Sequence, residues 1–450
     1  MRLLTAVLLI TPALIPAAAA GAAQDPAPIR GPLVQAAPTT KRLAVVMIQN
    51  GSTEEKQAQL ADTAYARNLF LGTADSLASW TDAVTRGLLR FTAAGEGVYL
   101  APPNAALAAG AGDTTKCYSE QARVTAQDHL AGLGVAWDSL AVVFDTGACD
   151  WGGLGQVPGR VTWFPPRPSL AAVVHEVGHN HGYPHETRRD CPGNVVSSCK
   201  AAGYSGNSPM GSGGAGRGYS SPELLHSGWL QAAWHRDVTA PGAWTLQPLY
   251  APASLSGPRV LEIRASATLR YLVELRARGA VDTAVDKPGV RVYAVAVSGG
   301  TPDYRNAYMI NPTRSGDPRH VPAGTVLTDA ANKLVIRVRA ATAASARVEV
   351  SATGAKPSPS PSASLSPSPS ATPSAPPSAS PTGTVGATPT GTPAAVAAPA
   401  ATPEVSLLST TQQVSGVLIG GAAVALVAVG GFALLGVRNS GRRRPRRQPR

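Results

Sequence analysis

Residues 175–185 read HEVGHNHGYPH, in which His175, Glu176, His179, Gly182 and His185 fit the spacing HExxHxxGxxH. His175 and His179 are four residues apart, so a helix would place both imidazoles on one face, close enough to bind one metal ion. Gly182 allows the chain to turn sharply out of that helix with positive φ. His185 would then follow as a third ligand. Three protein ligands leave the fourth tetrahedral position of a zinc ion for water, as in catalytic zinc sites.

Glu176 follows the first histidine of this stretch and would lie beside the bound metal. From there its carboxylate could take a proton from a zinc-bound water and pass it to a leaving amine. The residues therefore predict one catalytic Zn²⁺ held by His175, His179 and His185, with Glu176 as general base and acid. His181 does not fit the ligand spacing. Binding of Ca²⁺ is not indicated and is left open.

The pattern resembles the metzincin zinc peptidases, whose signature adds a methionine turn downstream. NSPMG at 207–211 is a candidate for that turn, with Met210 below the metal. Within this family the chain looks most like the gametolysin group, through CDWGG at 149–153, the SPMG of the turn and LLHSGWL at 224–230. The resemblance covers about residues 41–235. It implies an extracellular zinc endopeptidase (hydrolase) that cleaves protein or peptide substrates.

Two features depart from the metzincin pattern. Glu186 follows the third histidine, where metzincins often carry Asp or another small residue. Some members also have a tyrosine shortly after the methionine, and none follows Met210 here. The sequence gives no reason to assign that role to Tyr183, Tyr204 or Tyr219, so stabilisation of the oxyanion is left to zinc.

Strand-like and helix-like segments alternate before and around the histidines. Residues 41–49 and 139–144 are apolar runs typical of buried strands, whereas 74–90 and 117–133 have helical spacing. This alternation indicates an α/β (α+β) fold. With the resemblance, it predicts a metzincin-like zinc protease domain over residues 41–240.

Residues 241–352 have a different character. Short runs with period-two alternation are separated by turns, which predicts an all-β, sandwich-like domain. This segment contains no visible catalytic constellation. We expect it to support the first domain or to bind substrate.

The two ends of the chain read as targeting and anchoring segments. A signal peptide is predicted at 1–23 and a flexible leader at 24–40. A Pro/Ser/Thr/Ala-rich, disordered stalk is predicted at 353–413, one transmembrane helix at 414–437 and a basic cytoplasmic tail at 438–450. These segments predict a single-pass protein of the cell membrane, with its N-terminal ectodomain outside the cell.

The positive charge of the chain is concentrated at its C-terminus. The formal charge is +12, and without the seven arginines of the last thirteen residues it falls to +5. Membrane topology explains such a cluster, so we do not expect nucleic acid as a partner.

The four cysteines are an even number, as expected for two disulfides in a secreted chain. Three pairings are open. We favour Cys117–Cys149 and Cys191–Cys199, because the second pair would close a short polar loop.

Two other functions compete with the endopeptidase. A zinc amidase acting on cell-wall peptides would use the same residues. A non-catalytic surface adhesion module would keep zinc as a structural ion. The adhesion module is the weaker alternative, because Glu176 is present and because a structural zinc needs a fourth protein ligand.

Overall fold

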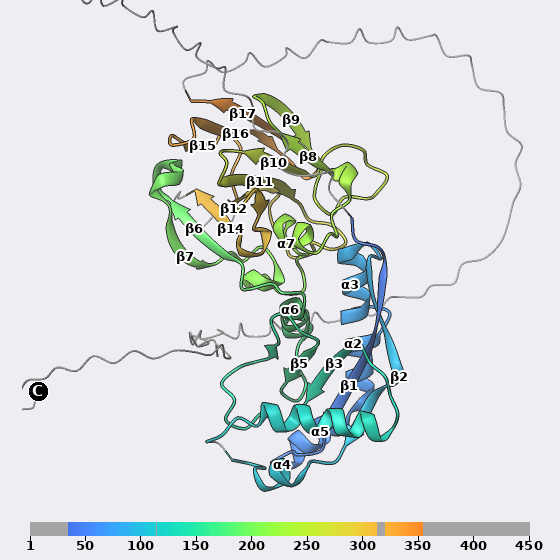
Figure 1. Ribbon diagram of the computed structural model, residues 1–450. Helices are drawn as coiled ribbons and strands as arrows, with labels where there is room; N and C mark the ends of the chain where they lie inside the picture. Colours follow the sequence, from blue (N-terminus) through green and yellow to red (C-terminus); the bar gives the residue numbers. More distant parts are fainter. Residues whose placement is uncertain (1–34, 114, 313–319, 354–450) are drawn as a thin grey trace, which may run out of the picture. The chain divides into compact units, whose positions relative to one another are not determined.

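The computed structural model describes residues 35–113, 115–312 and 320–353 (Figure 1). The predicted signal peptide, stalk, transmembrane helix and basic tail lie outside these residues, apart from the first residue of the stalk. No helix in the described part of the chain is both long enough and apolar enough to cross a membrane.

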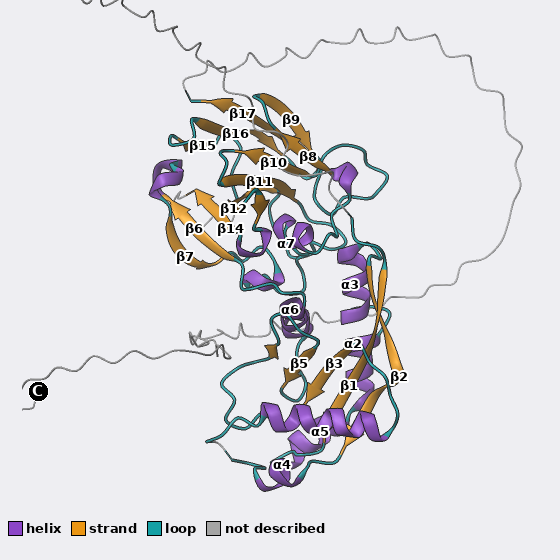
Figure 2. Cartoon of the chain, in the orientation of Figure 1, coloured by secondary structure: helices purple, strands orange, loops and turns teal. Residues whose placement is uncertain are grey.

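A five-stranded sheet forms the N-terminal part of the structure (Figure 2). Its strand order is β2-β1-β3-β5-β4, with four parallel strands and an antiparallel edge strand β4. The strands are β1 Thr39–Ile48, β2 Leu89–Ala101, β3 Ser139–Val143, β4 Leu154–Gly155 and β5 Val161–Phe164. Parallel strands covered on both faces need continuous apolar runs, which explains the apolar runs at 41–49 and 139–144.

Helices cover both faces of this sheet. They are α1 Glu54–Ala61, α2 Thr63–Leu71, α3 Leu77–Thr85, α4 Ala105–Ala109, α5 Ser119–Gly132 and α6 Leu170–Asn180. Alternate residues of β1 point into different cores, since Val45 shares a core with Phe70 of α2, whereas Val46 shares another with Ala126 of α5. Val177 of α6 belongs to the same core as Val45, so α6 lies on the α2 side of the sheet.

A larger sheet follows, in the order β7-β6-β14-β12-β11-β10-β8, with β13 paired to β12. Its strands are β6 Thr187–Cys191, β7 Lys200–Tyr204, β8 His235–Val238, β10 Val260–Arg264, β11 Leu269–Arg276, β12 Gly289–Ser298, β13 Thr301–Pro302 and β14 Tyr308–Pro312. A third sheet has the order β15-β16-β17-β9, from β9 Gly242–Leu246, β15 Val326–Asp329, β16 Leu334–Ala341 and β17 Ala346–Ala352.

Short helical segments join these strands. They are the α-helix α7 Ser221–His226 and the 3₁₀ turns η1 Pro192–Asn194, η2 Val196–Ser198, η3 Pro209–Gly211, η4 Ala232–Trp234 and η5 Tyr304–Asn306.

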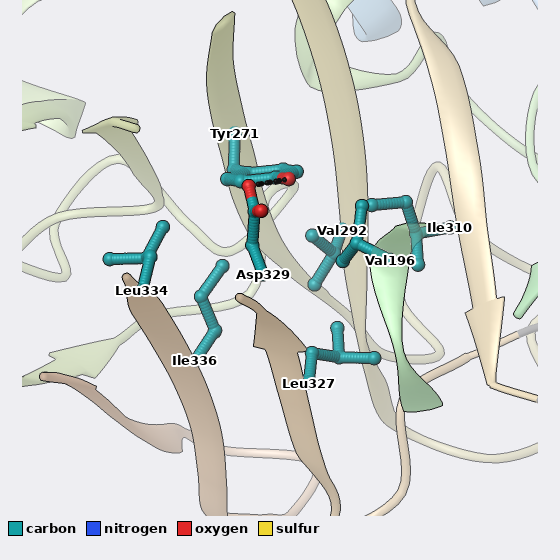
Figure 3. Close-up of a pocket in the computed structure, with 8 residues that line it drawn as sticks. All are labelled: Val196, Tyr271, Val292, Ile310, Leu327, Asp329, Leu334 and Ile336. Carbon is teal, nitrogen blue, oxygen red and sulfur yellow. Dashed lines mark hydrogen bonds between the residues drawn. The ribbon is translucent and has the colours of Figure 1, made fainter. Parts of the chain in front are cut away.

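The larger sheet and the third sheet share a hydrophobic core. Figure 3 shows Val292 of the larger sheet near Leu327 and Ile336 of the third sheet. In the same place the buried hydroxyl of Tyr271 donates a hydrogen bond to Asp329 Oδ2 at 2.7 Å. This bond satisfies two polar groups that would otherwise be costly to bury.

The predicted fold class, a protease domain followed by an all-β sandwich-like domain, is wrong for the described residues; the predicted transmembrane helix lies outside them. The described chain is a mixed α/β structure with several sheets. Strands β6 and β8 precede residue 241, yet β6 pairs with β14 and β8 pairs with β10. One hydrophobic core also runs from Val177 of α6 to Leu272 of β11. The division failed because strand partners far apart in the chain leave no local signal.

The structure contains the disulfides Cys117–Cys149 and Cys191–Cys199, which confirms the favoured pairing. The first joins the segment just before α5 to the loop after β3. The second closes the β6–β7 hairpin at the end away from Tyr204.

Candidate metal centre

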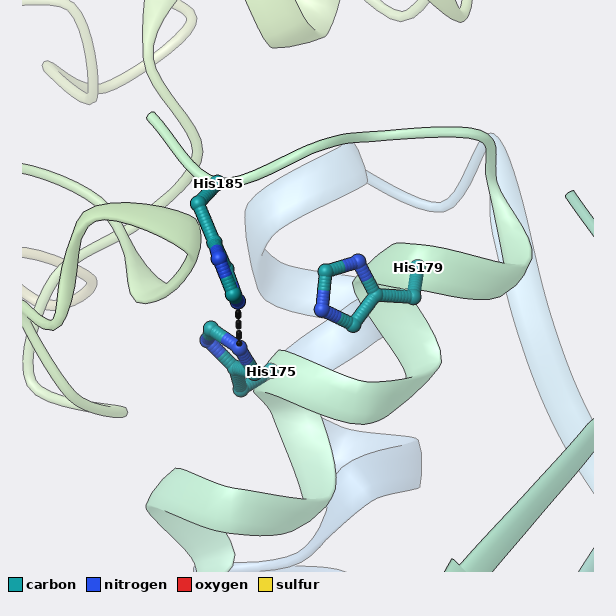
Figure 4. A group of neighbouring side chains, drawn as sticks. All are labelled: His175, His179 and His185. Carbon is teal, nitrogen blue, oxygen red and sulfur yellow. Dashed lines mark hydrogen bonds between the residues drawn. The ribbon is translucent and has the colours of Figure 1, made fainter. Parts of the chain in front are cut away.

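Three histidines converge at the end of α6 (Figure 4). The hydroxyl of Ser169 caps the helix by accepting a hydrogen bond from the Ala172 amide. One helical turn separates His175 from His179, and their ring centroids lie 4.9 Å apart. His185 returns from the following loop, with its ring centroid 5.1 Å from that of His175 and 5.0 Å from that of His179.

The turn after the helix delivers the third histidine. Gly182 has φ of +89°, which a residue with a side chain rarely adopts. The amide of Tyr183 donates to the Gly178 carbonyl at 3.4 Å, which ends the helix. The buried Tyr183 side chain anchors the turn by donating to the carbonyl of Glu223 at 3.0 Å.

Hydrogen bonds set the orientation of the first two imidazoles. His175 Nδ1 lies 2.8 Å from the Pro209 carbonyl oxygen, and His179 Nδ1 lies 2.7 Å from the Tyr183 carbonyl oxygen. Because a carbonyl can only accept, each Nδ1 carries the proton and each Nε2 keeps its lone pair. His185 Nε2 lies 3.2 Å from His175 Nε2.

The three side chains fit a metal ion. Their candidate ligand atoms all lie within 4.8 Å of one another. Burial lowers the pKa of His175, and burial together with the nearby His175 lowers the pKa of His179 and of His185 to about 4. Neutral imidazole is the form that binds metals, so the group could hold a metal ion.

The carboxylate of Glu176 is buried next to this group. Burial raises its pKa to about 8, and a hydrogen bond from the backbone amide of Gly155 in β4 opposes that shift. Two glycines allow β4 and the residues before it to lie close to α6. A Cβ atom on Gly153 would lie 2.7 Å from Glu176 Cγ, and one on Gly155 would lie 2.8 Å from His179 Cβ.

Met210 lies in a 3₁₀ turn packed against α6. A Cβ atom on Gly178 would collide with the Met210 sulfur, so the missing side chain of Gly178 leaves room for the methionine. The Met210 carbonyl accepts the Glu186 amide at 3.0 Å. On its other side the turn is held by Arg291 of β12, whose Nε donates to Asn207 Oδ1 at 2.8 Å.

Glu186, the residue that departs from the metzincin pattern, points away from the histidines into a buried polar cluster. Its carboxylate accepts a hydrogen bond from Ser205. The carboxylate of Glu223 lies in the same cluster and accepts from the Ser208 hydroxyl at 2.9 Å and the Ser220 amide at 2.7 Å. Burial raises the pKa of Glu186 to about 7 and the pKa of Glu223 well above its usual range.

Other histidines of the described chain do not join the metal group. His181 packs edge-on against Trp229, with ring centroids 4.9 Å apart, and burial lowers its pKa to about 3. His235 pairs with Glu262 in the larger sheet at 2.7 Å.

Sequence reasoning missed several residues of the site. Gly153 entered only as the last residue of CDWGG and Gly155 had no assigned role, although two glycines two residues apart can indicate close backbone approach. Tyr204 was set aside, yet its hydroxyl lies 3.3 Å from His185 Nδ1. Arg291 had no signal, because 84 residues separate it from Asn207.

Comparisons with known proteins add no assignment. No family model matches the chain, and no curated protein matches it. One solved structure with some likeness is described as "Structure of a chaperone-substrate complex"; it is 16% identical, with a TM-score of 0.24. The match covers 42% of this chain and 33% of that chain, so this chain spans about a third of that protein's length. A likeness this weak carries no argument about fold or function.

Proposed function

We propose that the protein is a metzincin-like zinc endopeptidase that hydrolyses protein or peptide substrates. The observation that carries this proposal is the convergence of His175, His179 and His185 beside the buried carboxylate of Glu176. Three imidazoles without a fourth histidine, cysteine or carboxylate in their group, as far as the structure is described, suit an open catalytic site better than a closed structural one.

Each residue of the site has a defined part in this proposal. His175, His179 and His185 would hold the ion through Nε2, with the two helical imidazoles oriented by backbone carbonyls. When bound, zinc would polarise a water molecule and the substrate carbonyl. A bound cation would favour the ionised form of Glu176, and this carboxylate would accept a proton from the attacking water and transfer it to the leaving nitrogen. The hydrogen bond from the Gly155 amide would hold the Glu176 carboxylate in place for both transfers.

The position of β4 supports a peptide as the substrate. It is the edge strand of the five-stranded sheet, and its Gly155 contacts Glu176 directly. An extended peptide can add to such an edge through main-chain hydrogen bonds, which would bring a scissile bond close to Glu176.

The proposal is tested by the zinc content and casein hydrolysis of the full-length protein, beside Glu176→Gln. We expect about one zinc per chain in both proteins. Hydrolysis should occur only in the parent and should stop on addition of a chelator. If the parent contains zinc but cleaves only cell-wall fragments, the protein is an amidase and the endopeptidase proposal is wrong. A parent that binds no zinc would overturn the assignment of the site.

A further inference from the structure

We propose that Tyr204 is a positioning residue for His185, through a hydrogen bond from His185 Nδ1–H to the phenol oxygen. This inference rests on the proposed metal site. The hydroxyl of Tyr204 lies 3.3 Å from His185 Nδ1, and the two rings meet edge to face with centroids 5.0 Å apart. A histidine that binds metal through Nε2 must carry its proton on Nδ1, so the phenol oxygen has to act as the acceptor.

His185 needs such support more than the other two ligands. His175 and His179 are held by α6, and each donates to a backbone carbonyl. His185 follows the helix in a loop and is itself exposed. A hydrogen bond on Nδ1 fixes the orientation of a ligand ring and raises the basicity of the nitrogen that binds the metal. In the third ligand, a side-chain hydroxyl therefore takes the place of the carbonyl.

The β6–β7 hairpin determines where this hydroxyl lies. Thr187, two residues after His185, pairs with Tyr204 in the ladder between β6 and β7. Arg188 Nη1 also donates to the Tyr204 carbonyl at 2.7 Å. The Cys191–Cys199 disulfide closes the other end of the hairpin. A slip of one residue in this pairing would turn the Tyr204 side chain to the opposite face, so the hairpin register supports the contact.

Tyr204→Phe is the direct test, because it removes the hydroxyl and keeps the ring. Zinc affinity of the full-length protein is measured by competition with a chromophoric chelator. We expect Tyr204→Phe to bind zinc at least about tenfold more weakly than the parent. The matched control is Tyr118→Phe, which loses a phenol hydrogen bond to Asp113 Oδ2 (2.9 Å) at the start of α5 and should keep the parent affinity.

A spectroscopic readout separates positioning from general destabilisation. In the Co²⁺-loaded protein, each ligand imidazole should give its own shifted Nδ1–H proton resonance. In Tyr204→Phe, the His185 resonance should exchange faster with water, while those of His175 and His179 stay unchanged. Parent-like zinc affinity and three unchanged resonances in Tyr204→Phe would overturn the role of Tyr204 and leave the proposed protease intact. Failure of the parent to bind zinc or Co²⁺ would overturn both.

Discussion

The Nδ1 atom of His175 lies 2.8 Å from the carbonyl oxygen of Pro209, 34 residues further along the chain. Pro209 begins the turn that contains Met210, and Arg291 of β12 holds the same turn through Asn207 at 2.8 Å. A strand of the larger sheet is thus connected to the first candidate ligand by two hydrogen bonds and one short turn. The C-terminal half of the described chain is part of the site's support.

Substitution of Arg291 should therefore weaken metal binding from a distance. Arg291→Met keeps most of the buried volume and removes the bond to Asn207, so we expect zinc affinity to fall roughly three- to tenfold. Competition titration measures the effect. Arg270→Met is a control for general loss of stability, since Arg270 is equally buried but pairs with Glu262 at 2.6 Å. Equal losses of affinity in both variants would count against a specific link through the turn.

Gly153→Ala should reduce peptide hydrolysis while zinc remains bound. The new methyl group would lie 2.7 Å from Glu176 Cγ, so the carboxylate or the β4 backbone has to move. A displaced general base costs about 10²-fold or more in turnover. Gly132→Ala is the control, because no atom lies within 4 Å of its added Cβ. Unchanged turnover in Gly153→Ala would show that Glu176 does not depend on this close approach.

Zinc should stabilise the folded protein measurably. A ligand that binds only the native state at 100 times its Kd adds about 2.7 kcal/mol to the free energy of unfolding. The unfolding temperature should therefore rise with zinc concentration and fall after chelation. His185→Ala should abolish most of this dependence, whereas His181→Ala should retain it. An unfolding temperature that does not change with zinc concentration would contradict metal binding, independently of any assay of hydrolysis.

Glu262 should make stability depend on pH in the acid range. Burial raises the pKa of this carboxyl, but His235, Arg270 and Tyr304 together lower it to about 2. A folded-state pKa below the ordinary value of 4.5 stabilises the protein above about pH 4.5, and that contribution disappears as the pH falls towards 2.

Urea unfolding of Glu262→Gln checks this prediction. We expect the variant to be less stable by roughly 3 kcal/mol at pH 7, with the difference from the parent shrinking towards pH 3. Glu120→Gln, which removes an exposed pair with Arg123, should have little effect at either pH. A difference for Glu262→Gln that is as large at pH 3 as at pH 7 would refute the electrostatic explanation.

The two disulfides should contribute unequally to stability. They close loops with sequence separations of 32 and 8 residues. Loop entropy gives about 3.7 kcal/mol for Cys117–Cys149 and about 2.5 kcal/mol for Cys191–Cys199. Denaturation of the two double Cys→Ala variants measures this order. Removal of Cys191–Cys199 should also weaken zinc binding, because it loosens the hairpin that positions Tyr204. Unchanged zinc affinity would show that the disulfide does not support the metal site through the hairpin.

The sequence by itself determined the features that depend on neighbouring residues. The spacing from His175 to His185 lies within one helix and one turn, so helical geometry and the positive φ of Gly182 suffice to bring the rings together. The apolar runs at 41–49 and 139–144 correspond to the buried strands β1 and β3, and the helical spacing at 117–133 corresponds to α5. These signals are local, because burial on both sides of a strand or one side of a helix leaves a periodic pattern.

Only the tertiary structure decided which strands share a sheet and what surrounds the histidines. Strand β6 pairs with β14, which lies more than a hundred residues away. The sequence of β6, Thr-Arg-Arg-Asp-Cys, has no apolar alternation that would indicate a strand. The contacts of Gly155 with Glu176, Arg291 with Asn207 and Tyr204 with His185 likewise join segments separated in the chain. Hydrogen bonds of this kind depend on the final packing of the sheets, so no local pattern of residue types specifies them.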